Sequence, residues 1–240
     1  MITELTDNTA DSPSPHSSRT EQSVELAVFL FLIVPSMVLS FFAVTQGSLG
    51  FALVAVATIC RDLALVSLIV FFLWRNGEAV AQLGWTLVRG QRELFLGVAL
   101  FVPFTFCAAL LERTLLAAGL SVPSTPLPAL TPARDLTDLL LAIALVVIVA
   151  VAEETIFRGY LLLRLQAVTA SPAVAVVLSA VVFSLGHGYE GSAGVVTVGV
   201  MGAVFAIVYR WRKSLVAPTV MHFLQDFVSI VMLPLLGVAK

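Results

Sequence analysis

The 240-residue sequence has little charge, because Asp, Glu, Lys and Arg together make up 12% of it. Soluble domains carry about 25% charged residues, so a soluble globular domain is not expected. The formal net charge is −2, and no basic excess points to nucleic acid as a partner. The two cysteines, Cys60 and Cys107, both lie in apolar runs and form no CxxC pair, so neither a redox centre nor a cysteine metal site is expected.

Hydrophobic residues are abundant instead: they form 59% of the chain, and the mean hydropathy is +1.03. A helix needs about 20 apolar residues to cross a bilayer, and only helices satisfy the backbone of such isolated runs in lipid. The sequence therefore predicts an all-α fold, a polytopic transmembrane helical bundle of about seven spans. The candidate spans are 24–45, 51–74, 94–118, 136–157 with a helical extension to about 169, 172–188, 194–210 and 215–237.

The domain organisation follows from the same pattern. Residues 1–23 form a polar tail rich in Ser, Thr and Pro, which we expect to be disordered, and residues 24–240 form a single membrane domain. If the N-terminus is cytoplasmic, most Lys and Arg residues of the loops fall on the cytoplasmic side, above all in RWRK at 210–213. Membrane proteins favour this distribution of positive charge. We therefore expect a multi-pass integral membrane protein with a cytoplasmic N-terminus. Its short chain and its spans rich in Ala, Val and Leu are typical of a prokaryotic cell membrane.

Charged residues inside apolar spans are candidates for function. One charge at the centre of a membrane helix costs about 2.5–3.5 kcal/mol on insertion scales, so such residues are paired or line a wet cavity. Arg61 and Asp62 lie in the middle of the second span. Adjacent helical residues do not face each other, so we expect each of them to pair with another helix in a structural role.

The stretch AEETIFRGY at 152–160 places three charges at the end of the fourth apolar run. Glu154 and Arg158 are four residues apart, a spacing that suits an ion pair on one helix face. Glu153 is turned by about 100° from Glu154 by the helical period. One acid is thus expected to neutralise the arginine, and the other is left free to act.

Two further pairs occur at the same spacing in later spans. Phe183 and His187 lie in VVFSLGHG, where a lone histidine is often only a packing residue. His222 and Asp226 lie in VMHFLQDFV, where the acid can orient the imidazole, or the pair can simply hold helices together.

Depth in the membrane connects these residues. If the chain turns at Ala170–Ser171, Glu153 and His187 lie at nearly equal depth on neighbouring antiparallel helices. An acid beside an imidazole is a general-base or metal-ligand arrangement.

Taken in order, the three patches resemble the motifs of the CPBP (also called Abi) family, which includes type II CAAX prenyl endopeptidases. EETIFR matches its EExxxR motif, FSLGH its FxxxH motif, and HFLQD its HxxxN or HxxxD motif. The resemblance covers a core at about residues 130–237. The matching residues are, in chain order, Glu153, Glu154, Arg158, Phe183, His187, His222 and Asp226.

This resemblance implies an intramembrane endopeptidase. Glu153 would activate water with the assistance of His187, while His222 and Asp226 would stabilise the oxyanion or complete a metal site. Strict relatives carry Asn where this chain has Asp226, and an ionised Asp cannot donate a hydrogen bond to an oxyanion. The residues expected to support the site structurally are Glu154, Arg158 and Phe183.

The expected cofactor is none, with zinc as the alternative, because one glutamate and two histidines form a credible zinc set. Its ligands would come from Glu153, His187, His222 and Asp226; the stronger zinc motif HEXXH is absent. The expected partners are the lipid bilayer and a peptide or membrane-protein substrate, and nothing indicates an oligomeric state. Two other functions stay open: a catalytically silent membrane protein that binds a regulator or peptide, and a transporter with a proton or cation path.

Overall fold

The computed structural model describes residues 18–45, 49–86, 90–123 and 135–237. Helices account for nearly all of these residues, and no strand occurs among them. The fold is therefore a polytopic helical bundle, as the sequence predicts. In chain order the elements are α1 (Arg19–Thr45), α2 (Phe51–Arg75), the 3₁₀ turn η1 (Val80–Leu83), α3 (Gly90–Ala117), α4 (Leu136–Glu153), η3 (Glu154–Leu161), α5 (Leu162–Thr169), α6 (Pro172–Leu185), the 3₁₀ turn η4 (Gly188–Glu190), α7 (Gly191–Arg212), α8 (Val216–Asp226), η5 (Phe227–Met232) and α9 (Leu233–Leu235).

All seven predicted apolar segments form helices, but only six are long and apolar enough to cross a membrane. The exception is α6, whose 14 residues fall short of a full crossing. The first helix begins earlier than expected, at Arg19, so it takes in the end of the predicted polar tail. Residues 1–17 of that tail lie outside the described residues. The helices fit a multi-pass membrane protein.

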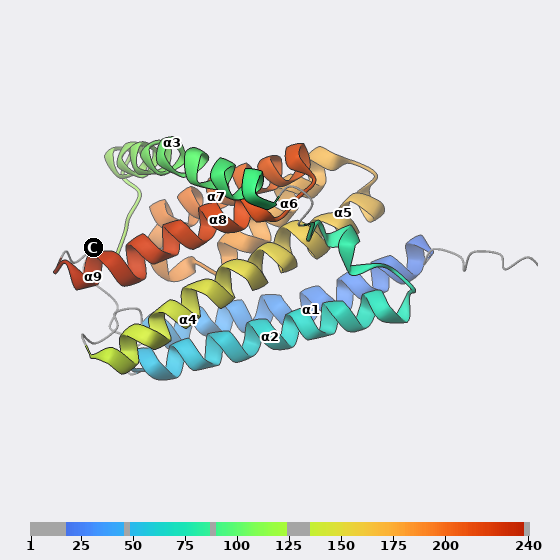
Figure 1. Ribbon diagram of the computed structural model, residues 1–240, viewed down its shortest axis with the longest axis horizontal. Helices are drawn as coiled ribbons and strands as arrows, with labels where there is room; N and C mark the ends of the chain where they lie inside the picture. The colour runs from blue at the N-terminus through green and yellow to red at the C-terminus, as the bar shows by residue number, and fades with distance from the viewer. Residues whose placement is uncertain (1–17, 46–48, 87–89, 124–134, 238–240) are drawn as a thin grey trace, which may run out of the picture.

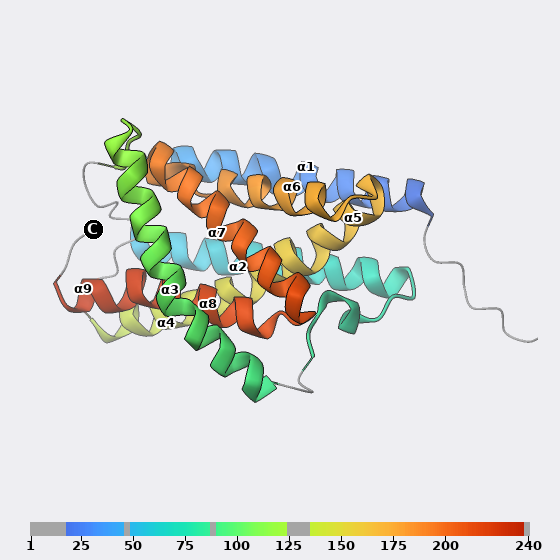
Figure 2. The same ribbon diagram turned by 90° about the horizontal axis from the view of Figure 1, so that it is seen from above.

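Most helices run along the long axis of the molecule, with α2 beside α4 (Figure 1). Viewed from above, α3 crosses obliquely over α7 and α8 (Figure 2). α8 also contacts α4, so that α2, α4 and α8 lie in sequence across the bundle. Residues from these three helices therefore meet in its interior.

The predicted turn between the fourth and fifth apolar segments is confirmed. Ala170 adopts the left-handed conformation, with φ of 55°, and ends α5. Ser171 then caps α6 by accepting a hydrogen bond from the backbone N–H of Val174, and Pro172 occupies the first helical turn. α5 and α6 pack together as a hairpin.

Two segments of π-helix interrupt the expected regular helices. η3 follows α4 directly and begins at Glu154, and η5 follows α8 directly after Asp226. Wider π-type turns inside α-helices are rare and occur often at functional sites. Both π segments adjoin residues that the sequence motifs single out.

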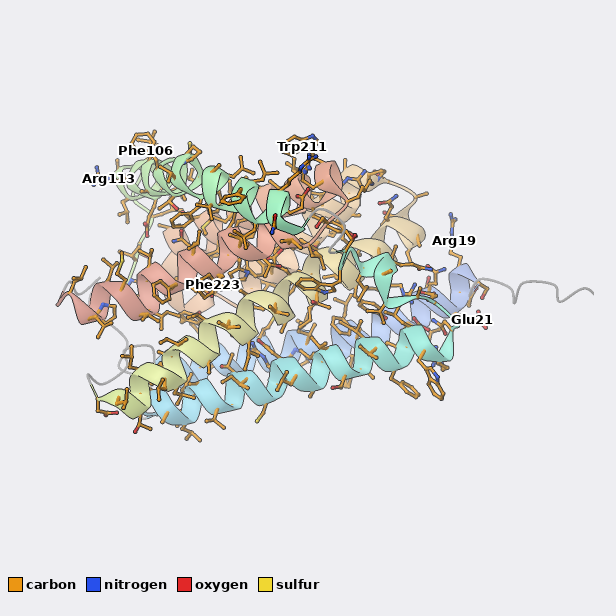
Figure 3. The ribbon with its side chains drawn as sticks, viewed as in Figure 1. Arg19, Glu21, Phe106, Arg113, Trp211 and Phe223 are labelled. Carbon is orange, nitrogen blue, oxygen red and sulfur yellow. The ribbon has the colours of Figure 1, made fainter. Side chains whose placement is uncertain are left out.

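Charged residues at one end of the bundle form a buried network. Arg164 of α5 lies 3.3 Å from Glu25 of α1 and 2.9 Å from Glu78, and Arg75 at the end of α2 also pairs with Glu25. Figure 3 marks this end with Arg19 and Glu21 of α1. An open cavity of about 910 Å³ lies at this end, lined in part by Glu25, Phe72 and Trp74, and none of the motif residues lines it.

Candidate active site

The predicted ion pair of the first motif is present and buried. Nη1 of Arg158 donates a hydrogen bond of 2.8 Å to Oε1 of Glu154, across one turn of η3. The side chain of Glu154 is 0% exposed and that of Arg158 is 1% exposed. Such a pair is stable only because each charge neutralises the other in a low-dielectric interior.

Aromatic rings enclose the Arg158 guanidinium. Its central carbon lies 4.2 Å from the ring centroid of Phe183 and 5.2 Å from that of Phe205. Both rings offer their π electrons to the cation, which partly replaces lost hydration. Gly202 of α7 makes this packing possible, since a Cβ there would lie 2.9 Å from Phe183 and 3.1 Å from Nη2 of Arg158. Phe183 thus packs directly on the Arg158 guanidinium, and its role in supporting a site stays a prediction.

Glu153, the last residue of α4, points to different partners. Oε1 lies 3.8 Å from Nη2 of Arg61, and Oε2 lies 3.8 Å from Nε2 of His222. Both distances exceed a hydrogen bond. Oε2 is buried and has no hydrogen-bond partner among the described residues. A buried carboxylate oxygen with no partner is a site where a water or a substrate group can bind.

His222 of α8 connects the acidic residues. Nδ1 lies 2.9 Å from Oε1 of Glu154, and Nε2 lies 3.4 Å from Oδ2 of Asp226. The ring stacks on Phe205 at a centroid distance of 5.7 Å. Both ring nitrogens therefore face carboxylates, an arrangement in which a protonated imidazole can donate on both sides. The structure thereby brings the first and third motifs together.

His187 stands apart from this cluster. It follows the end of α6, is half-buried, and its Nδ1 lies 3.2 Å from the carbonyl oxygen of Phe183. Its ring packs against that of Phe183 at 4.9 Å, and Phe183 in turn meets His222 at 6.0 Å. No hydrogen bond or ion pair joins His187 to Glu153 among the described residues, so their pairing stays a prediction.

The interpretation of Arg61 and Asp62 was partly wrong. The two adjacent residues do pair with each other, because the long Arg61 side chain folds back so that Nε donates a 2.9 Å hydrogen bond to Oδ1 of Asp62. Arg61 also reaches across to Glu153 of α4. Their position in the middle of a span was the available signal, but the sequence does not say which helix lies opposite α2.

The arrangement of donors bears on the zinc alternative. In the described part of the chain, no three His, Cys, Asp or Glu side chains are placed to hold one metal ion together. His222, which a zinc site needs, has both nitrogens directed at carboxylates, and His187 faces a backbone carbonyl. As arranged, these donors do not converge on one metal position, and the choice between a metal-free site and zinc stays a prediction.

Comparison with known families points the same way as the motifs. A family model described as type II CAAX prenyl endopeptidase Rce1-like matches residues 135–228. This segment runs from the cap of α4 to just beyond Asp226 and includes every residue of the three motifs. No curated protein and no solved structure matches the chain. The match confirms the resemblance for this segment, and the family implies a protease.

Proposed function

We propose, from the Rce1-like segment at residues 135–228, that this chain is an intramembrane endopeptidase acting on a membrane-associated or leader-bearing substrate. The observation that carries the proposal is the Oε2 atom of Glu153. It is buried without a hydrogen-bond partner among the described residues, beside two cationic or polarisable groups, Arg61 and His222. A carboxylate held in this way is suited to take a proton from water.

In this mechanism Glu153 is the general base. It removes a proton from a water molecule, and the water oxygen attacks the carbonyl carbon of the scissile peptide bond. His187, which follows the end of α6, assists by orienting the water or the substrate from the other side. Its half-buried position leaves the ring accessible to a substrate that enters the bundle.

His222 and Asp226 hold the site together around Glu153. The His222 ring sits between the two acids of the first motif and Asp226, so it fixes their separation and balances their charge. Because both nitrogens of His222 face carboxylates, the pair positions Glu153 rather than binding the oxyanion directly. Glu154, Arg158 and Phe183 form the buried support behind the ring.

The donor arrangement favours a metal-free reaction, with zinc as the alternative. Substrates with a prenylated CAAX end are one possibility that the family description offers. Leader peptides or other membrane proteins are better suited to a prokaryotic membrane. The lipid bilayer is the surrounding partner, and nucleic acid has no role.

The experiment that tests the proposal compares new protein N-termini in membranes from cells that make the wild-type protein or Glu153→Gln. The substitution keeps the size of the side chain and removes the base, so termini produced by the wild type are expected to disappear. Half-buried Glu112 of a different helix, α3, provides a control, because Glu112→Gln is expected to leave the termini unchanged. Both variants are first compared with the wild type for expression level and unfolding temperature.

Each result has a defined meaning. Termini that depend on Glu153 establish proteolysis and identify substrates and cleavage sites together. Identical termini in all three membranes would contradict the protease and favour a catalytically silent binding protein of the same fold. Ion-dependent flux in liposomes without any cut peptide would instead favour the transporter.

A further inference from the structure

α2 places a second charged pair in the membrane interior, outside the family-matched segment. Asp62 is 1% exposed, whereas the Arg61 side chain is 29% exposed. Arg61 therefore contacts a buried acid while part of its own side chain stays accessible. Since α2 packs against α4, Nη2 of Arg61 lies 3.8 Å from Oε1 of Glu153.

Asp62 fixes the orientation of the guanidinium. Nε and Nη2 of Arg61 lie 2.9 Å and 2.8 Å from the same oxygen, Oδ1 of Asp62. Two contacts from one planar group to one carboxylate hold it in a defined plane. The gap of 3.8 Å between Nη2 and Oε1 of Glu153 is too long for a hydrogen bond, so Arg61 and Glu153 do not saturate each other.

The other charged groups near Glu153 are poorly suited to bind an oxyanion. Both nitrogens of His222 are directed at carboxylates, and Asp226 in its ionised form has no proton to donate. Arg158 is 1% exposed and is enclosed by Glu154 and Phe183. Arg61 is the partly exposed cation among these described neighbours of Glu153.

We propose that Arg61 is a further catalytic residue, which donates a hydrogen bond to the carbonyl oxygen of the substrate as that oxygen becomes negative. A cation that is already held in position in a low-dielectric site stabilises developing charge strongly. No protein group has to reorient as that charge forms. The inference rests on the proposed function, and it assigns to α2 the donor that Asp226 cannot supply.

The reaction balances with these groups. Water loses a proton to Glu153 and forms a bond from its oxygen to the carbonyl carbon. The electron pair of the C=O π bond moves to oxygen, where Arg61 binds the anion. When the intermediate collapses, the C–N bond breaks and Glu153 returns the proton to the leaving nitrogen. The products are a carboxyl end and an amino end, and no oxidant or reductant is needed.

A structural role for Arg61 is the competing explanation, since its charge also offsets Asp62 within the bundle. Two variants separate these roles. Arg61→Ala removes the guanidinium and leaves Asp62 unpaired. Arg61→Met combined with Asp62→Leu removes both charges, and replacing a buried ion pair by apolar residues is often neutral or stabilising.

The assay uses full-length protein in liposomes and a synthetic peptide that spans a cleavage site found from the N-terminal comparison. If Arg61 binds the oxyanion, both variants lower kcat by about 10²- to 10³-fold with little change in KM. Methylguanidine added to Arg61→Ala restores part of kcat in a saturable manner, because it can occupy the vacated site. Arg75→Ala is the control, because Arg75 also lies on α2 and pairs with buried Glu25, but at the far end of the bundle. This variant is expected to lower stability, and methylguanidine is expected to have no effect on its kcat.

The results distinguish the two proposals. Normal kcat in the folded double variant, with Glu153→Gln inactive, overturns the role of Arg61 and leaves the peptidase intact. Cleavage that persists in Glu153→Gln overturns the proposed function, and the role of Arg61 with it. If Arg61→Ala does not fold, kcat of the double variant decides the question alone.

Discussion

Nδ1 of His222 lies 2.9 Å from Oε1 of Glu154, the same oxygen that accepts the hydrogen bond from Arg158. One carboxylate oxygen thus joins α8 to the π segment that follows α4. Because Glu154 has no exposed surface, this contact is shielded from water. The third motif is therefore tied to the first through a buried polar atom, and disturbing one is expected to disturb the other.

Replacing Arg158 by Met is expected to destabilise the fold. The change keeps an unbranched side chain but leaves Glu154 without its guanidinium partner, and breaking a buried pair in this way costs about 3–5 kcal/mol. The unfolding temperature in detergent measures the effect. Arg113→Met on the exposed side of α3, labelled in Figure 3, is the control and is expected to change little. Equal unfolding temperatures for the two variants would show that the pair contributes nothing to stability.

Asp226→Asn is expected to keep most of the peptidase activity. The amide oxygen can still accept a hydrogen bond from Nε2 of His222, which faces Asp226 at 3.4 Å. We expect kcat/KM to change by less than about fivefold in this variant. Asp226→Ala removes the acceptor and is expected to lower kcat/KM by about 10- to 100-fold, as for loss of a hydrogen bond to a charged group. An Asn variant as inactive as the Ala variant would mean that the negative charge itself is required.

Gly202→Ala is expected to destabilise the packing around Arg158. The added Cβ would meet Phe183 at 2.9 Å and Arg158 at 3.1 Å, so the ring and the guanidinium must shift. Overpacking of this kind costs about 1–3 kcal/mol. Gly50→Ala is the matched control, since nothing lies within 4 Å of a Cβ at that position. The unfolding temperatures of both variants measure the difference in stability. Equal unfolding temperatures would show that Phe183 and Arg158 move aside without cost.

Exhaustive chelation is expected to leave cleavage unchanged, because the described donors do not converge on one metal position. The measurement is peptide cleavage in liposomes before and after treatment with a strong zinc chelator, followed by dialysis. A chelator matched in charge but saturated with zinc beforehand controls for effects on the membrane. Activity that is lost on chelation and restored by zinc would establish the alternative set of Glu153, His187, His222 and Asp226.

The sequence by itself determined the class of fold and the segments that form it. Apolar runs of about 20 residues leave helices as the available membrane structure, and each predicted run is indeed helical. The Glu154–Arg158 pair was also predictable, since it depends only on the local helical period. The turn at Ala170–Ser171 was predictable for a similar reason, because Ser and Pro at the start of α6 are local capping signals.

Only the tertiary structure decided which helices face one another. That α2 lies beside α4, and so brings Arg61 to Glu153, depends on contacts between residues far apart in sequence. The length of α6 and the two π segments likewise depend on packing, since apolar composition is compatible with continuous helices there. Local patterns specify the direction of a side chain on its own helix, and packing of the whole bundle specifies what that side chain meets.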